Sequence, residues 1–352
     1  MTAPHGAHRA AAPTQTPPPG TYPSGHAGFA REWTGALWSG PKLPEPSAPE
    51  LHSPRSLGAT MRRAPFWIAV GGLLIGAVLA WVGGSTGSTP NEVVLGVAGL
   101  FAVGGPIVAL VLGTARRLRI EASVPRVATW WGLAAGVIAV GVALGLESAF
   151  RALVGSASEP GYLFAGPAEE FAKLLVPLIL LAVGLPWIRD PRAGVWVVVL
   201  AGAVFGIFEG IEFAVGSGLH QDKVLGDVDL SGLSESTRHA LLTFAGTMGR
   251  AWVELLHVMI TAGAASVIWL NLARGTRKAA GLIIGMWLAA AALHSFNDGV
   301  LTLLPGAGPQ FASIVFIVAL YTLWYRPLVR RLVPPDALAA VPTRWIPPLP
   351  RG

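Results

Sequence analysis

Eight long apolar stretches, separated by short polar segments, make up most of the chain between residues 63 and 331. Each stretch is close to the length of about 20 residues that an α-helix needs to cross the hydrocarbon core of a bilayer. We expect spanning helices at about 66–84, 93–114, 127–149, 162–185, 193–216, 246–270, 279–304 and 309–325. The pattern therefore predicts an all-α polytopic membrane protein, built as a bundle of about eight transmembrane helices.

The two ends of the chain have a different pattern. Residues 1–62 show no periodic apolar face and are rich in Pro, Gly, Ser and Ala, a composition typical of disorder. Residues 332–352 form a short Pro-rich segment of the same kind. We expect a disordered, cytoplasmic N-terminal tail over 1–62, a transmembrane helical domain over 63–331 and a C-terminal tail over 332–352.

Composition supports a membrane protein over a soluble one. The 352 residues are 53% apolar and 12% charged, whereas a soluble domain carries about 25% charged residues. The net charge of +6 could indicate nucleic-acid binding, but the basic residues lie at the ends of the apolar stretches, where topology signals lie. The chain has no cysteine, which excludes disulfides, iron–sulfur clusters and thiolate zinc sites.

Loops with several arginines alternate along the chain with loops that contain few or none. The positive-inside rule then places both termini in the cytoplasm. With only four lysines, many arginines and abundant Ala, Gly and Trp, the composition suggests a GC-rich bacterial genome. We therefore expect a multi-pass protein of a bacterial cell membrane.

Ionisable side chains are concentrated in the fourth to seventh spans, although such a group costs roughly 2.5–3.5 kcal/mol inside a span. They are Glu169, Glu170, Lys173, Glu209, Glu212, Arg250, Glu254, His257, His294 and Asp298. Residues from different spans lie six to ten positions from the expected outer ends, a depth of roughly 9–15 Å. A single polar pocket toward the outer side of the bilayer would explain this shared depth.

Spacing along each span agrees with a shared pocket. His294 and Asp298 are four residues apart and therefore share a helix face. Lys173 is three and four residues from the adjacent carboxylates Glu170 and Glu169. Two neighbouring carboxylates are costly to ionise together in a low dielectric, so the pKa of one of them should rise. A carboxylate with a raised pKa suits a general acid or base near neutral pH.

Other polar residues of these spans fit a structural role. Arg250 and Glu254, four residues apart, are interpreted as a structural ion pair. Glu212 is close enough to the end of its span to reach the outer interface.

Three motifs carry a resemblance to a known family. EEFAK (169–173), FGIFE (205–209) and HSFND (294–298) occur in this order. They resemble the EExxK, FxxxE and HxxxD motifs of the PrsW-type intramembrane proteases, distant relatives of the CAAX-prenyl and bacteriocin-processing proteases. His257, seven residues after Arg250, is similar to a further Arg…His motif of that family, with Leu255-Leu256 where the family usually has Pro-Gly. The resemblance covers about residues 125–325.

The resemblance implies a glutamate-dependent peptidase. It would hydrolyse a peptide bond of a membrane-anchored protein near the outer side of the bilayer, such as a regulatory substrate of the anti-sigma-factor kind. The partners would be this substrate and the lipid bilayer, with no nucleic acid; the oligomeric state stays open.

The catalytic residues that the resemblance implies are Glu169, Glu170, Lys173, Glu209, His257, His294 and Asp298. In our hypothesis Glu169 is the general base and Glu209 helps to hold the attacking water. The two histidines either stabilise the oxyanion or bind a divalent metal such as zinc together with Glu209. Since the sequence contains no HExxH motif, a metal-free mechanism also stays open.

Two other functions are compatible with buried ionisable residues. A proton-coupled secondary transporter uses such groups as relays, but transporters usually show inverted repeats with a site at the midplane, and no internal repeat is evident here. A catalytically silent membrane scaffold is the other alternative, which only a cleavage assay excludes.

Overall fold

The computed structural model describes residues 20–23, 29–33, 38–44, 63–86, 89–118, 120, 124–154, 158–219, 230–273, 279–304 and 308–332. The chain divides into two compact units. One unit runs from Arg55 to Leu332, and the other comprises Met1–Pro54 and Val333–Gly352.

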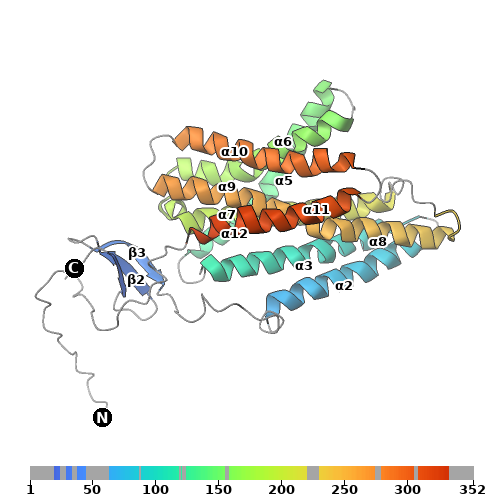
Figure 1. Ribbon diagram of the computed structural model, residues 1–352, viewed down its shortest axis with the longest axis horizontal. Coiled ribbons are helices and arrows are strands. Elements are labelled where there is room, and N and C mark those ends of the chain that lie inside the picture. Colours follow the sequence, from blue (N-terminus) through green and yellow to red (C-terminus); the bar gives the residue numbers. More distant parts are fainter. Residues whose placement is uncertain are drawn as a thin grey trace, which may run out of the picture. The chain divides into compact units, whose positions relative to one another are not determined.

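The unit Arg55–Leu332 is a bundle of helices, which Figure 1 shows in sequence colours. Its long helices are α2 (Ala64–Ser85), α3 (Glu92–Leu118), α5 (Arg126–Val154), α6 (Ser158–Ala182), α7 (Pro191–Leu219), α8 (Glu235–Val253), α9 (Leu255–Ala273), α10 (Ala279–Ser295) and α11 (Gly308–Ala319). Short elements complete it: η1 (Pro186–Arg189), η3 (Phe296–Val300), η4 (Leu301–Leu303), η5 (Leu320–Tyr325) and α12 (Arg326–Arg330). Among the described residues of this unit there is no strand, which confirms the all-α membrane fold.

Seven helical segments in the described part of the chain are long and apolar enough to cross a membrane. The last of them, Phe311–Arg330, corresponds to the shortest predicted span. Helix α6 is also long, with 25 residues, and packs against α5 and α10. It is less apolar because its sequence includes three glutamates and a lysine. The prediction of about eight spans is therefore close.

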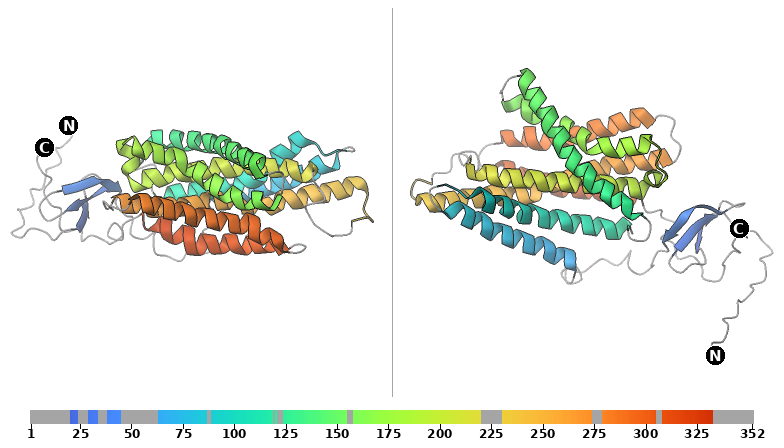
Figure 2. Two further views of the ribbon diagram at one scale, coloured as in Figure 1. Left: turned by 90° about the horizontal axis from the view of Figure 1, so that it is seen from above. Right: turned by 180° about the vertical axis from the view of Figure 1, so that it is seen from behind.

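Helix α7 lies at the centre of the bundle, where it packs against α3, α5 and α9. Val195, Val197 and Val198 have no exposed surface. The peripheral helices α2 and α5 expose large apolar side chains such as Leu74 and Trp130, as expected of surfaces that face lipid. Figure 2 shows α5 crossing the bundle obliquely.

The predicted sixth span differs from the structure. Instead of one helix over 246–270, two helices, α8 and α9, occupy 235–273 and meet at Glu254. Helix α8 begins early because Ser234 caps it: the Ser234 side chain accepts a hydrogen bond from the Thr237 backbone N–H. The first turns are polar, so hydropathy does not reveal them. The break at Glu254 places its carboxylate next to His257.

Three short strands lie in the segment predicted to be a disordered tail. β1 (Gly20–Pro23), β2 (Phe29–Trp33) and β3 (Trp38–Pro44) form an antiparallel sheet in the order β1-β2-β3. Gly20 pairs with Trp33, and Trp33 pairs with Trp38. Pro and Gly within such short segments weaken the alternating pattern by which a strand is recognised. The rest of residues 1–62, and residues 333–352, lie outside the described residues.

Candidate active site

Five helical elements bring their polar side chains together in the interior of the bundle. Helix α6 supplies two glutamates and a lysine, α7 supplies one glutamate, α9 and α10 supply one histidine each, and the turn η3 supplies an aspartate. The seven residues expected to be catalytic, Glu169, Glu170, Lys173, Glu209, His257, His294 and Asp298, therefore lie in one connected network.

Lys173 is the cation at the α6 side of this network. Its Nζ lies 2.7 Å from Glu170 Oε1 and 3.3 Å from Glu169 Oε2, and the side chain has no exposed surface. The same Nζ lies 4.5 Å from the centre of the Phe205 ring, a favourable cation–π distance. The spacing of three and four residues in the EEFAK motif thus brings the lysine to both glutamates.

His257 has a tautomer that its neighbours determine. Its Nδ1 lies 2.8 Å from Lys173 Nζ, and because an ammonium group can only donate, Nδ1 must accept. Nε2 then carries the hydrogen, and it lies 2.7 Å from Glu209 Oε2 and 2.8 Å from Glu254 Oε2. The ring is therefore held between a donor on one side and two carboxylates on the other.

His294 is surrounded by acids. Its Nδ1 lies 3.0 Å from Glu170 Oε1, and its Nε2 lies 3.1 Å from Asp298 Oδ2 and 3.5 Å from Glu169 Oε2. Asn297 donates a hydrogen bond to the other oxygen of Asp298, at 2.8 Å. The predicted sharing of one face by His294 and Asp298 is therefore present in the structure.

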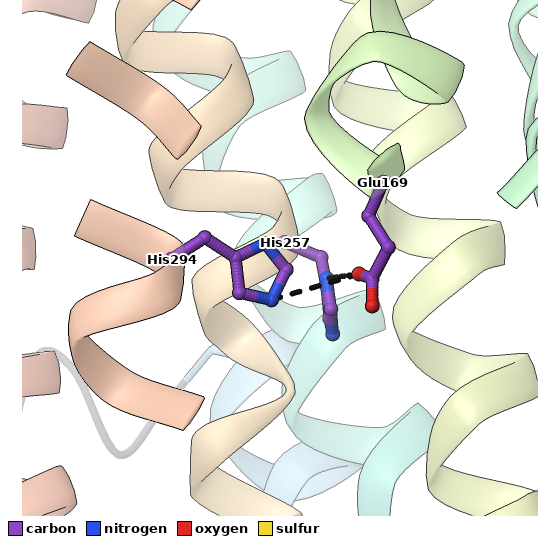
Figure 3. Close-up of side chains that lie close together, drawn as sticks. All are labelled: Glu169, His257 and His294. Carbon is purple, nitrogen blue, oxygen red and sulfur yellow. Dashed lines mark ion pairs between the residues drawn. The ribbon is translucent and has the colours of Figure 1, made fainter. Parts of the chain in front are cut away.

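Glu169 Oε2 lies between the two imidazoles, as Figure 3 shows. It is 3.6 Å from His257 Nδ1 and 3.5 Å from His294 Nε2, and the two rings are 5.1 Å apart. One carboxylate and two imidazoles from three helices, with donor atoms within 4.8 Å of one another, form a trio that could hold a metal ion. Two His and one carboxylate are an ordinary zinc donor set that leaves a position for water.

The metal set that we expected, Glu209 with both histidines, is not the set that the structure brings together. Glu209 contacts His257 but belongs to a second trio, completed by Glu254. Arg250 occupies that second trio: its Nη2 lies 3.0 Å from Glu209 Oε1 and its Nε 2.6 Å from Glu254 Oε1. This second trio also offers only one imidazole, so the trio of Glu169, His257 and His294, with two imidazoles and one carboxylate, is the better metal candidate.

The balance of charge supports a cation in the network. Five carboxylates, Glu169, Glu170, Glu209, Glu254 and Asp298, face the two basic side chains Lys173 and Arg250 and the two imidazoles. Buried charges need compensation, and a divalent ion would supply it. The ion would compete with Lys173 for His257 Nδ1, but Glu170 would keep the lysine paired.

Three functional neighbours were not predicted from the sequence. Glu254 and Arg250, interpreted as a structural pair, also hold Glu209 and orient His257. The sequence did contain a signal for this role. Glu254 and His257 follow Arg250 by four and seven residues, a spacing that places all three on one helix face. Thr261, which donates a hydrogen bond to Glu170 Oε2 at 2.6 Å, gave no signal in the sequence.

Glycine allows α7 and α9 to approach closely at this point. A Cβ atom on Gly206 would lie 2.8 Å from Glu254 O and 3.0 Å from His257 Cδ2. The glycine of the FGIFE motif thus permits the contact between Glu209 and His257. Glu212, three residues further along α7, is exposed, in keeping with its interpretation as an interface residue.

Comparison with known proteins agrees with this geometry. The family model of the PrsW family intramembrane metalloproteases matches residues 123–324, which is more than half of the chain. No curated protein and no solved structure gave a match. The matched region runs from α5 to η5 and contains every residue of the network described above. The chain therefore belongs to the PrsW family of intramembrane metalloproteases, as a multi-pass membrane protein of the peptidase class.

Proposed function

We propose that this protein cuts a membrane-anchored protein substrate by glutamate-dependent hydrolysis of a peptide bond near the outer side of the bilayer. The observation that supports this proposal best is the place of Glu169, a carboxylate on α6 with one imidazole from α9 and one from α10 beside it. A general base must be within reach of the water it activates, and its own position must be fixed by neighbours. Glu169 meets the second condition through three contacts of 3.3–3.6 Å.

The proposed reaction uses the two oxygens of Glu169 differently. Oε2 stays against Lys173 and the imidazoles, and Oε1 accepts a proton from the attacking water. The water oxygen bonds to the peptide carbon, and the carbonyl oxygen becomes an oxyanion, whose negative charge the ammonium group of Lys173 beside Glu169 offsets. When the C–N bond breaks, Glu169 returns the proton to the leaving amine, so protons and charge balance.

The remaining carboxylates position these groups. Asp298 and Glu170 each face one nitrogen of His294 and thereby fix its ring. Glu254 and Glu209 do the same for Nε2 of His257. Such hydrogen bonds from carboxylates to histidines orient both metal ligands and catalytic imidazoles.

The metal that the family name implies fits the trio of Glu169, His257 and His294, on the donor chemistry and the charge balance given above. When bound, a divalent metal such as zinc polarises a carbonyl group and makes a bound water more nucleophilic. We expect the purified protein to retain about one equivalent of divalent metal per chain. His294→Ala should lose it, and Glu212→Gln, a change on the exposed part of α7, should keep it. Elemental analysis measures both; a cleaving protein without metal would contradict this part of the proposal.

The outer location is supported by the loop charges and by where the residues lie in their helices. His294 is the penultimate residue of α10, and Asp298 lies in the turn that follows. The basic loop at 274–278 precedes α10, so the positive-inside rule assigns its far end to the outside. The bacterial cell membrane is the compartment that this topology and the composition favour.

The proposed function is tested with reporters that have one transmembrane segment and a different fluorescent domain on each side, reconstituted with the protein in vesicles. We expect a cut in the outer half of the reporter segment, located by mass spectrometry of both fragments. His294→Ala should abolish the cut, while His239→Ala, on α8 and outside the network, should not. A cut in the inner half, or equal cleavage by His294→Ala, would refute the proposal.

A further inference from the structure

Helix α6 contains a proline two residues before Glu169. Pro167 has no backbone N–H, so the carbonyl of Leu163, four residues earlier, loses the donor that a regular helix provides. In a lipid environment a carbonyl without a donor is costly. A hydrogen bond from outside the helix would therefore stabilise α6 at this point.

Ser295 on α10 supplies that hydrogen bond. Its Oγ donates to Leu163 O at 2.8 Å. The two helices are close enough because residue 166 is glycine: a Cβ there would lie 2.7 Å from Ala291 O and 2.8 Å from Ser295 N. The bond thus joins α6 and α10 directly beside Glu169 and His294.

A second contact reinforces this seam between α6 and α10. The Trp287 indole N–H donates to Pro167 O at 3.2 Å, from the same helix as Ser295. These two hydrogen bonds lie beside a contact between α6 and α10 that the proposed reaction needs. In that contact Glu170 Oε1 lies 3.0 Å from His294 Nδ1.

The helix changes its geometry directly after Ser295. Residues Phe296–Val300 form a π-helical turn, η3, which carries Asp298. Such turns are rare, less regular than α-helix and frequent at functional sites. The hydrogen bond of Ser295 fixes the last α-helical residue before this turn. It therefore also fixes the position of His294 and Asp298 along the helix axis relative to α6.

We propose that Ser295 is a positioning residue, which donates to the carbonyl released by Pro167 and thereby sets the register of the His294 helix against the Glu169 helix. In this proposal it acts through the two helices that its hydrogen bond joins. The inference rests on the proposed peptidase function for its activity readout, but its geometric content can be tested independently.

The activity test is a double-mutant cycle with the cleavage reporter. Ser295→Ala should lower kcat about tenfold and leave KM within about twofold, because small displacements of reacting groups are costly. Pro167→Ala gives Leu163 O its helical donor back, so Ser295→Ala should cost less than about twofold in that background. The matched control is Ser266→Ala, because Ser266 donates to Ala262 O in its own regular helix.

The geometric test uses the absence of cysteine from the sequence. Ile179→Cys on α6 and Ile284→Cys on α10, both exposed on the bundle surface, can carry a pair of spin labels without background labelling. Ser295→Ala should broaden the distance distribution between the labels, and adding Pro167→Ala should narrow it again.

The outcomes of the two tests separate the two proposals. If the unmodified chain cuts no reporter, the proposed function fails, and the spin-label distances alone decide about Ser295. An equal loss of kcat in both backgrounds, or a distance distribution that Ser295→Ala leaves unchanged, overturns the positioning role.

Discussion

Glu169→Gln should lower kcat/KM for reporter cleavage by about a thousandfold, within the range that removal of a general base produces. Glutamine has the size and shape of glutamate, and its amide oxygen can still face Lys173 and the two imidazoles. It cannot accept a proton from water, however. The loss is therefore expected in kcat, while the amount of inserted protein and its melting temperature change little.

Glu212→Gln is the matched control for this prediction, since it makes the same chemical change on an exposed part of the neighbouring helix. It should cleave the reporter at the parental rate. A Glu169→Gln variant that keeps a third or more of the parental kcat/KM would show that another group takes the proton.

Lys173→Met should produce the largest loss of stability among single substitutions in the network. Lys173 is fully buried and contacts Glu170, which is fully buried as well. Removal of one partner of a buried ion pair leaves an uncompensated charge and typically costs about 3–5 kcal/mol. Unfolding of the purified protein in mixed micelles, with increasing denaturing detergent, measures the change in free energy.

Two further variants make this stability prediction specific. Arg151→Met removes a cation from an exposed pair with Glu147, at 3.5 Å, and should cost less than about 1 kcal/mol. Glu170→Gln combined with Lys173→Met removes both charges and should recover much of the loss. A double variant as unstable as Lys173→Met would mean that packing, and not charge, explains the effect.

The sequence predicted the helical bundle and the pairing of residues within one helix for clear physical reasons. Apolar stretches of spanning length are required by the bilayer itself, and charged groups within them need partners. Residues on one helix with a spacing of four, such as His294 and Asp298, must share a face, and the structure pairs them. These features depend on local spacing, which a single sequence contains.

Contacts between different helices were harder to predict, because hydropathy gives the depth of a residue but not the direction in which its helix is rotated. That rotation decides that Glu169, and not Glu209, lies between the two imidazoles. Likewise, the break at Glu254 between α8 and α9 makes its carboxylate a neighbour of His257. Both features depend on packing across the bundle.

The contact between Lys173 Nζ and His257 Nδ1 has a consequence for how the reaction begins. With the ammonium group in place, the lone pair of that nitrogen is already occupied. In the folded protein this nitrogen is therefore blocked. Lys173 must release His257 Nδ1 before a metal ion or a polarised water can bind there. Glu170 and the ring of Phe205 contact the same ammonium group, so Lys173 keeps a carboxylate and an aromatic partner when it gives up the contact with His257.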